Sequence, residues 1–301
     1  MKFVSRITII GLAIAVVAGS GIAVAKSPHQ GRPAPRGERT VPPSTVRPDQ
    51  TSSIPRRYAV VNSGSLPAPT GAQTHGEVLC PPNTVVWGGG VFIQLRSLWA
   101  NVNSSYPTGS TGWAANVNNA SGSDTTFTVY AICAKQPRNY AVVSAVFPNP
   151  AESQSTGEVS CPGTSKVLGG GSYSDSASTT YANINSTLPI SGKTWWVNMN
   201  NGWISAHVTV FAVCGNTRGR ARYSGSIQVP NPAGEQTFSS VSCPAGQVPS
   251  GGGGYSSALD HSAVTLNSTY PDGAGWSSYE NNAGSGNPPY TKSFVICVGG
   301  P

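Results

Sequence analysis

The segment Cys161–Gly171 has the sequence CPGTSKVLGGG, and related segments occur at two other places in the chain. They are CPPNTVVWGGG at Cys80–Gly90 and CPAGQVPSGGGG at Cys243–Gly254. Each copy begins with Cys-Pro and ends in a run of glycines. Self-similarity at a fixed period of about 80 residues indicates a repeat architecture, so we expect three copies of one structural unit.

Other features of the sequence recur with the same period. Each copy opens with a tyrosine, and an Asn-Ser-Ser or Asn-Ser-Thr segment, a tryptophan and a pair of asparagines follow the glycines. These elements are Tyr58, Tyr140 and Tyr223; Asn103–Pro107, Asn185–Pro189 and Asn267–Pro271; Trp113, Trp196 and Trp276; and Asn118, Asn119, Asn200, Asn201, Asn281 and Asn282. So many coincident positions support three homologous repeats rather than chance.

The cysteines recur as pairs. Six cysteines permit 15 pairings, but only one pairing gives every repeat the same bridge. The predicted disulfides are Cys80–Cys133, Cys161–Cys214 and Cys243–Cys297. Each should stabilise its repeat by roughly 4 kcal/mol in the chain-entropy model. Metal binding is the alternative, and it is disfavoured because no cysteine or histidine lies within ligand spacing of another.

The composition favours strands. Only 10% of the 301 residues are charged, and there are 36 glycines and 25 prolines. Short β-branched and aromatic runs lie between Gly, Pro, Asn and Ser residues, which is typical of β-strands. We therefore expect an all-β fold with three tandem antiparallel β repeats of about 80 residues. The repeats should pack together in a pseudo-threefold, prism-like or sandwich-like arrangement, with one disulfide in each.

Two further features favour packed repeats. The last strand of each repeat is apolar on both faces, so it should be covered from two sides. The expected strands are Thr126–Cys133, Val208–Cys214 and Lys292–Cys297. The glycine runs indicate bulges or close approach of another backbone, and three of them could line a shared axis. A phosphate-binding loop is the alternative, but it would need lysine and serine or threonine at fixed offsets.

The N-terminus has the pattern of an export signal. Lys2 and Arg6 precede an apolar stretch that ends in Ala23-Val24-Ala25, a small-x-small cleavage pattern. An uncleaved membrane anchor is the alternative. The predicted organisation is a signal peptide (1–25), a disordered basic Pro-rich linker (26–57) and repeats at 58–138, 139–220 and 221–301. We expect a secreted, extracellular protein with no membrane contact after signal cleavage.

The net charge of +7 is unevenly distributed. The linker holds seven basic residues against Glu38 and Asp49, whereas nine basic and nine acidic side chains balance from Tyr58 onward. Nucleic-acid binding needs clustered Lys and Arg on the folded surface, so a nucleic-acid partner is disfavoured. The linker is either a spacer or a tether to an anionic cell-wall polymer.

Catalytic patterns are weak. Glu77 and Glu158 are equivalent, but the third copy has Ser240 there, and glycoside hydrolysis needs paired carboxylates. Asp260-His261-Ser262 are adjacent, whereas a catalytic triad is assembled from distant positions. The four histidines show no metal-ligand spacing. We expect a protein that is not an enzyme and has no cofactor.

The recurring tryptophans and asparagines are the candidate binding residues. An aromatic face beside amide side chains suits a sugar ring, and three weak sites would gain affinity by multivalency. The candidates are Trp113, Asn118, Asn119, Trp196, Asn200, Asn201, Trp276, Asn281 and Asn282. The alternative is that the tryptophans fill the core and that the asparagines are turn residues.

The segment Cys161–Gly171, together with the Asn-Ser-Thr-x-Pro, Trp and terminal Val-x-Ala-x-Cys elements, resembles tandem repeats of secreted, uncharacterised bacterial proteins, especially actinobacterial ones. The resemblance covers Tyr58–Pro301 and implies no activity or functional residues. The first functional hypothesis is a non-catalytic binding module of the cell surface or matrix, with carbohydrate as the candidate ligand. A structural or coat protein without a small ligand is the alternative, and a secreted hydrolase is the third hypothesis.

Overall fold

The computed structural model describes residues 54–176, 180–219, 221–258, 263–285 and 287–299. They belong to one compact unit, Val41–Pro301. The predicted signal peptide and the linker up to residue 53 lie outside the described residues, as do Asp260, His261 and Ser262. Strands are the only regular elements in the described ranges, and no helix there is long and apolar enough to span a bilayer.

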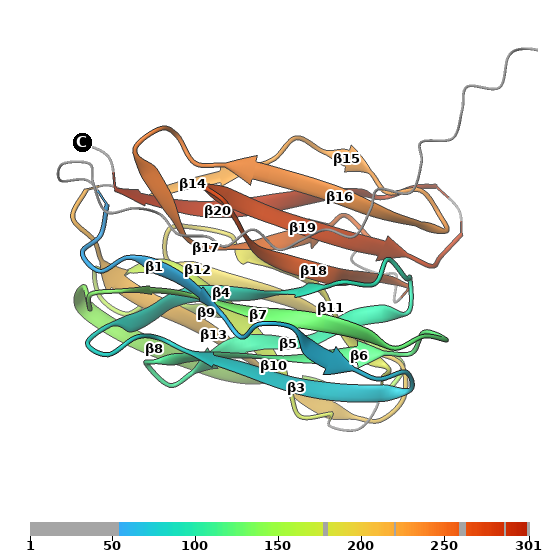
Figure 1. Cartoon of the computed structure of the whole chain (residues 1–301). Coiled ribbons are helices and arrows are strands. Elements are labelled where there is room, and N and C mark those ends of the chain that lie inside the picture. Colours follow the sequence, from blue (N-terminus) through green and yellow to red (C-terminus); the bar gives the residue numbers. More distant parts are fainter. Residues whose placement is uncertain (1–53, 177–179, 220, 259–262, 286, 300–301) are drawn as a thin grey trace, which may run out of the picture. The chain divides into compact units, whose positions relative to one another are not determined.

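The strands form three corresponding series, one in each repeat (Figure 1). The first series is β1 (Ala59–Asn62), β2 (Leu66–Ala68), β3 (Ala72–Leu79), β4 (Val85–Ile93), β5 (Ala100–Thr108), β6 (Gly112–Asn119) and β7 (Thr125–Ala134). The second is β8 (Arg138–Asn149), β9 (Ser153–Ser160), β10 (Lys166–Ser174), β11 (Ala182–Pro189), β12 (Thr194–Asn201) and β13 (Ala206–Asn216). The third is β14 (Arg222–Gly225), β15 (Val229–Pro230), β16 (Glu235–Ser242), β17 (Gln247–Ser256), β18 (Val264–Asp272), β19 (Gly275–Asn282) and β20 (Tyr290–Gly299).

Each of the three antiparallel sheets is shared by two repeats. Sheet A has the order β1-β7-β4-β18-β19-β16, sheet B β3-β6-β5-β10-β13-β8 and sheet C β14-β20-β17-β11-β12-β9. The repeats therefore join where β4 meets β18, β10 meets β5 and β17 meets β11. Since every repeat pairs with both others, the chain closes into a ring with pseudo-threefold symmetry. The predicted all-β fold of packed repeats is confirmed.

The glycine runs make this closure possible. A Cβ on Gly169 would lie 2.8 Å from the Cα of Gly88, and one on Gly251 would lie 2.6 Å from the Cα of Gly169. The three backbones thus meet at the axis with no room for side chains. The register of β4, β10 and β17 also shifts at these glycines, as at a β-bulge. Of the three interpretations of such runs, a bulge, a positive φ or the close approach of another backbone, the first and the last are confirmed, whereas no glycine of these runs has a positive φ.

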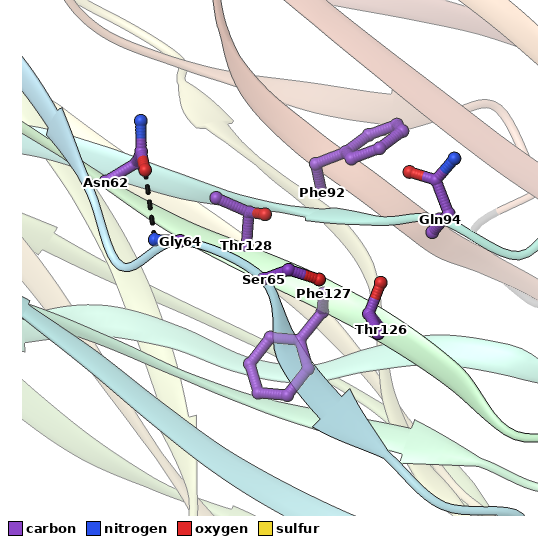
Figure 2. A pocket seen from close by; sticks show the side chains of 8 residues that line it. All are labelled: Asn62, Gly64, Ser65, Phe92, Gln94, Thr126, Phe127 and Thr128. Atoms are coloured by element: carbon purple, nitrogen blue, oxygen red, sulfur yellow. Dashed lines mark hydrogen bonds between the residues drawn. The ribbon is translucent and has the colours of Figure 1, made fainter. Parts of the chain in front are cut away.

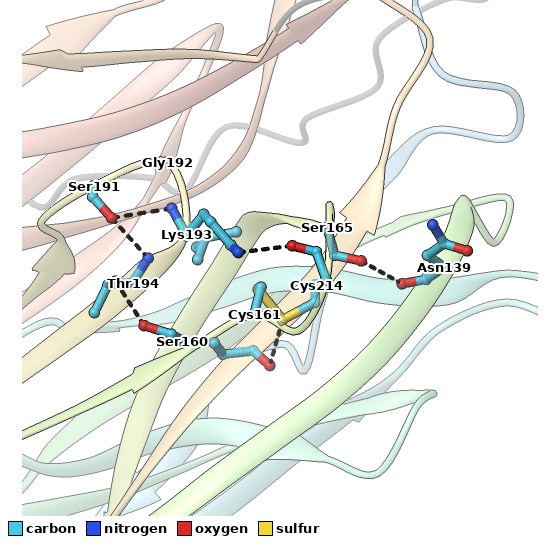
Figure 3. Close-up of a disulfide and its surroundings, with 12 residues drawn as sticks. Asn139, Ser160, Cys161, Ser165, Ser191, Gly192, Lys193, Thr194 and Cys214 are labelled. Carbon is cyan, nitrogen blue, oxygen red and sulfur yellow. Dashed lines mark hydrogen bonds between the residues drawn. A yellow bond between two sulfur atoms is a disulfide. The ribbon is translucent and has the colours of Figure 1, made fainter.

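The three predicted disulfides are present, and no described cysteine is free. Each joins the residue that begins the turn before the glycine strand to the last strand, with 5.6 Å between the Cα atoms. Around Cys161–Cys214 the neighbouring turns are also held together: Lys193 Nζ donates to the Gly163 carbonyl at 2.7 Å (Figure 3). Formed disulfides are consistent with an oxidising compartment.

Candidate functional site

The tryptophans expected to bind a sugar lie in the core. Trp113 is 0% exposed and Trp276 is 1% exposed. In the second repeat the corresponding residue is Trp195, also 0% exposed, whereas Trp196 is the half-buried next residue on β12. The assignment of Trp196 was therefore wrong by one position. The register shows why, because a shift of one residue moves a side chain to the other face of a strand.

The indole nitrogens of Trp113, Trp195 and Trp276 each have a partner inside their own repeat. Trp113 Nε1 donates to Ser105 Oγ at 2.9 Å, and Trp195 Nε1 donates to Thr187 Oγ1 at 2.9 Å. Trp276 Nε1 makes the same bond to Thr269 Oγ1 at 2.8 Å. The last residue of each Asn-Ser-Ser/Thr segment is thus the acceptor that allows a tryptophan to be buried completely.

The first asparagine of each pair closes the ring. Asn118 Nδ2 donates to the Ala182 carbonyl at 2.9 Å, and Asn103 Nδ2 donates to the same oxygen at 2.8 Å. The equivalents follow the ring: Asn185 and Asn200 donate to Val264, and Asn267 and Asn281 donate to Ala100. Each repeat therefore holds the next one through two amides on one buried carbonyl. These side chains have no free donors of the kind that the sugar hypothesis requires.

The serine of the same segment adds a second bond between repeats. Ser104 Oγ accepts from the backbone N–H of Ser174 at 3.0 Å, and Ser186 Oγ accepts from Ser256 at 2.9 Å. Ser268 Oγ accepts from Ile93 at 2.9 Å. The opening tyrosines act similarly, and Tyr140 OH donates to the Val86 carbonyl of the preceding repeat at 2.9 Å. Burial raises the pKa of this phenol, so it remains a donor.

The second asparagine of each pair anchors loops within its own repeat. Asn119 Nδ2 donates to the Ala68 carbonyl, Asn201 Nδ2 to Asn149 and Asn282 Nδ2 to Asn231, at 2.7 to 2.8 Å. The structure thus buries all six predicted asparagines and two of the three predicted tryptophans. The expected sugar platform is not formed by them, because the ring and the core use these side chains.

An exposed aromatic pair occurs at a different place, on the second repeat. Tyr181 is 56% exposed and Trp203 is 63% exposed, and their rings stack with centroids 5.6 Å apart at 24°. Tyr181 directly precedes β11, and Trp203 lies in the loop between β12 and β13. The equivalent of Tyr181 in the first repeat is Trp99, which is 58% exposed, and in the third repeat it is Ala263. The stacked pair is specific to the second repeat.

Backbone contacts position the pair. The Gly202 N–H donates to the Tyr181 carbonyl at 3.2 Å, and the Trp203 N–H donates to Asn201 Oδ1 at 3.3 Å. Asn201 Nδ2 also donates to the Ile204 carbonyl at 2.7 Å. Asn201 was predicted to bind a ligand itself, and it instead orders the loop that carries Trp203.

A salt bridge joins the bases of the two loops. Asp175 follows β10 at the start of the segment that leads to Tyr181, and His207 follows the Trp203 loop. The Asp175 carboxylate accepts from the His207 backbone N–H at 2.7 Å and lies 3.1 Å from His207 Nδ1. These two residues are thus hydrogen-bonded to each other next to the aromatic pair.

Sequence reasoning missed Tyr181 and Trp203 because it searched for what recurs. The available signal was the opposite one, the aromatic Trp203 in a turn-rich segment where the other copies have Ser121 and Gly284. Repeated positions are constrained by the shared axis, whereas a residue found in one copy is free of that constraint.

A second candidate is a shallow hollow on sheet A. It has a volume of about 220 Å³ and is lined by Asn62, Gly64, Ser65, Phe92, Gln94, Thr126, Phe127 and Thr128. Figure 2 shows Phe92 and Gln94 on one side of it, while the Phe127 ring points away. The lining has no acidic or basic side chain, and drug-sized ligands usually occupy about 300–1,000 Å³. The hollow is therefore a weaker candidate than the aromatic pair.

The described part of the chain contains no cluster of three or more His, Cys, Asp or Glu residues that could hold a metal ion. Glu77 and Glu158, considered above as carboxylates, lie on the edge strands β3 and β9 of two different sheets. A comparison with models of protein families found no match to this chain, and a search of curated proteins found none either.

Proposed function

We propose that this is a secreted, non-catalytic protein that binds carbohydrate through Tyr181 and Trp203. The observation that carries the proposal is the pair of stacked rings, each more than half exposed. Large aromatic side chains bury a large area on binding, and exposing two of them together is unfavourable without a ligand.

The surroundings favour a neutral sugar over other ligands. A sugar ring stacks its apolar C–H face on an aromatic ring while its hydroxyl groups seek donors and acceptors. Thr180 directly precedes Tyr181, Ser205 lies two residues after Trp203, and the Asp175 carboxylate lies 3.1 Å from His207 Nδ1. An anionic ligand would meet the Asp175 carboxylate here.

The expected location also supports this function. The signal-like segment 1–25 and the resemblance to secreted bacterial repeat proteins indicate export, and the three disulfides suit an oxidising exterior. The basic linker would tether the three folded repeats to an anionic cell-wall polymer, which would keep them near cell-surface glycans.

A structural or coat function is the second candidate. This function is favoured because the recurring asparagines are used to join the repeats to one another. The result is a disulfide-bonded ring whose recurring side chains leave few donors free. A coat protein of this kind would not need a small ligand.

A glycan array with the disulfide-bonded full chain separates the two functions. We expect binding to a set of neutral glycans, and Trp203→Ala should weaken it at least tenfold, about 1.4 kcal/mol. Trp99→Ala is the control, since Trp99 is a similarly exposed tryptophan at the first-repeat position equivalent to Tyr181 and has no stacked partner among the described residues, and it should bind as the wild type does. No binding by the wild type at millimolar sugar, or equal losses in both variants, would reject the carbohydrate site.

A further inference from the structure

The third repeat contains an acidic residue in its interior. Glu280 on β19 is 0% exposed, and its register neighbours are Thr237 on β16 and Leu266 on β18. Counted from the core tryptophan, the equivalent residues are Val117 in the first repeat and Met199 in the second. A carboxyl group thus occupies a position that is apolar in both other copies.

The residues around Glu280 are polar as well. Ser278 precedes it on the inward face of β19, and Ser293 and Thr291 face inward from β20. The first repeat has Ala115, Val129 and Phe127 at these positions, and the second has Val197, Val210 and Val208. Ser239 Oγ and Ser293 Oγ lie 2.8 Å apart and join sheet A to sheet C. Hydroxyl groups thus replace the hydrocarbon that fills the other two repeats.

The Glu280 carboxyl has no partner within the described part of the chain. Neither of its oxygens makes a hydrogen bond, and Thr291 Oγ1 is also buried without one. A buried ionised carboxylate without a partner costs several kcal/mol, so the group takes up a proton instead. Burial raises the pKa of Glu280 well above its usual value, and desolvation is the cause.

No charged side chain faces Glu280 from the strands around it. On β17 and β20, Tyr255, Tyr290 and Lys292 belong to the outer face, where Tyr255 contacts Tyr290 and Lys292 lies over Phe294. Glu235 is exposed at the start of β16.

At the opposite end of β18, the Asp272 carboxylate accepts a hydrogen bond from Ser277 Oγ at 2.8 Å. It therefore has its own partner. The proton on Glu280 is thus governed by burial alone.

We propose that Glu280 is a buried proton-binding site that couples the stability of the third repeat to pH. The protonated form is neutral and fits among the hydroxyl groups of Ser278, Thr291 and Ser293. Loss of the proton leaves a charge in a closed interior, and the third repeat opens to hydrate it.

The sign of the effect follows from linkage. The unfolded state has the ordinary glutamate pKa of about 4.3, and the folded state a higher one. Below the unfolded value both states are protonated and stability is constant. Between the pKa of the unfolded state and the higher pKa of the folded state, Glu280 loses its proton only in the unfolded state. The equilibrium constant for opening of the third repeat therefore increases by up to about tenfold per pH unit in this range.

Hydrogen exchange of the disulfide-bonded full chain tests the proposal, with the other repeats as internal standards. Exchange in β19 and β20 is measured from pH 5 to 8 relative to the equivalent strands of the other repeats, β6 and β7 and β12 and β13. This ratio removes the intrinsic pH dependence of amide exchange, which all strands share. We expect the relative opening of β19 and β20 to rise with pH in the wild type. It should become independent of pH in Glu280→Met and in Glu280→Gln.

Glu235→Gln is the matched control, because it removes an exposed carboxylate from the same repeat, and it should behave as the wild type does. A wild-type ratio that does not change with pH would overturn the proposal, as would an unchanged slope in Glu280→Met. If calcium chloride protected β19 and β20 in the wild type but not in Glu280→Gln, the carboxylate would be ionised and hold a cation, which also overturns the proton site.

Discussion

The interiors of the first and third repeats have the same backbone and opposite chemistry. Val117, Phe127 and Val129 fill the first, whereas Glu280, Thr291 and Ser293 occupy the same positions in the third. All six side chains are buried. Leu266 and Ile296 are the fully buried third-repeat residues of the main apolar core, and Val248, Trp276, Val295 and Val298 belong to a second, smaller apolar cluster.

This difference shows what holds the third repeat closed. Its amides and serines make the same bonds between repeats as those of its neighbours. Its disulfide closes a loop of nearly the same length, with cysteines 54 residues apart against 53. Ring closure, the disulfide and a smaller apolar cluster together keep the fold where hydrophobic burial is reduced. The first two repeats have both kinds of stabilisation.

Transplanting the carboxyl group should produce the largest effect. Val117→Glu puts an ionisable group into an interior where Phe127 and Val129 stand in place of Thr291 and Ser293. We expect a loss of about 3–5 kcal/mol in the free energy of unfolding at pH 7, measured by chemical denaturation. The milder Val117→Thr should lose about 1–3 kcal/mol. A Val117→Glu protein as stable as the wild type would show that the two interiors are equivalent.

Removing a disulfide should lower the free energy of unfolding somewhat less than Val117→Glu does, by roughly 4 kcal/mol at most. The loss should be similar in the first and third repeats, because their loops have nearly equal length. The location of the damage should differ. In the double variant Cys243→Ser and Cys297→Ser, β19 and β20 should lose hydrogen-exchange protection ahead of the rest. In Cys80→Ser with Cys133→Ser, apolar packing should keep β6 and β7 protected. Equal losses of hydrogen-exchange protection in the two variants would contradict the view that the third repeat depends more on its disulfide than the first repeat does.

The ring-closing asparagines should give the smallest and most uniform effect. Asn103→Ala, Asn185→Ala and Asn267→Ala each leave the neighbouring carbonyl one donor, so we expect a loss of about 1–2 kcal/mol from each. The three values should agree within about 0.5 kcal/mol, because the network is the same in all repeats. Thermal unfolding at fixed pH measures this, and a larger loss from Asn267→Ala alone would place the weakness of the third repeat at the ring rather than in the interior.

Much of the fold was predictable from what recurs. The cysteine spacing predicted all three disulfides, and the glycine runs predicted both the bulges and the close approach at the axis. The candidate site was not predictable in the same way. Recurrence of Trp113 and Asn118 was interpreted as a repeated binding site, but those residues recur because three copies must bury the same indole and close the same ring.

The sequence by itself determined the strand-forming units, their number and their bridges, because these depend on local patterns of period two and on spacing along the chain. Only the tertiary structure decided that each sheet is shared by two repeats, that Trp195 rather than Trp196 enters the core, and that Tyr181 and Trp203 meet on the surface. It also decided that Glu280 is buried without a partner. Register, contact and burial depend on segments far apart in the chain, and local pattern does not encode them.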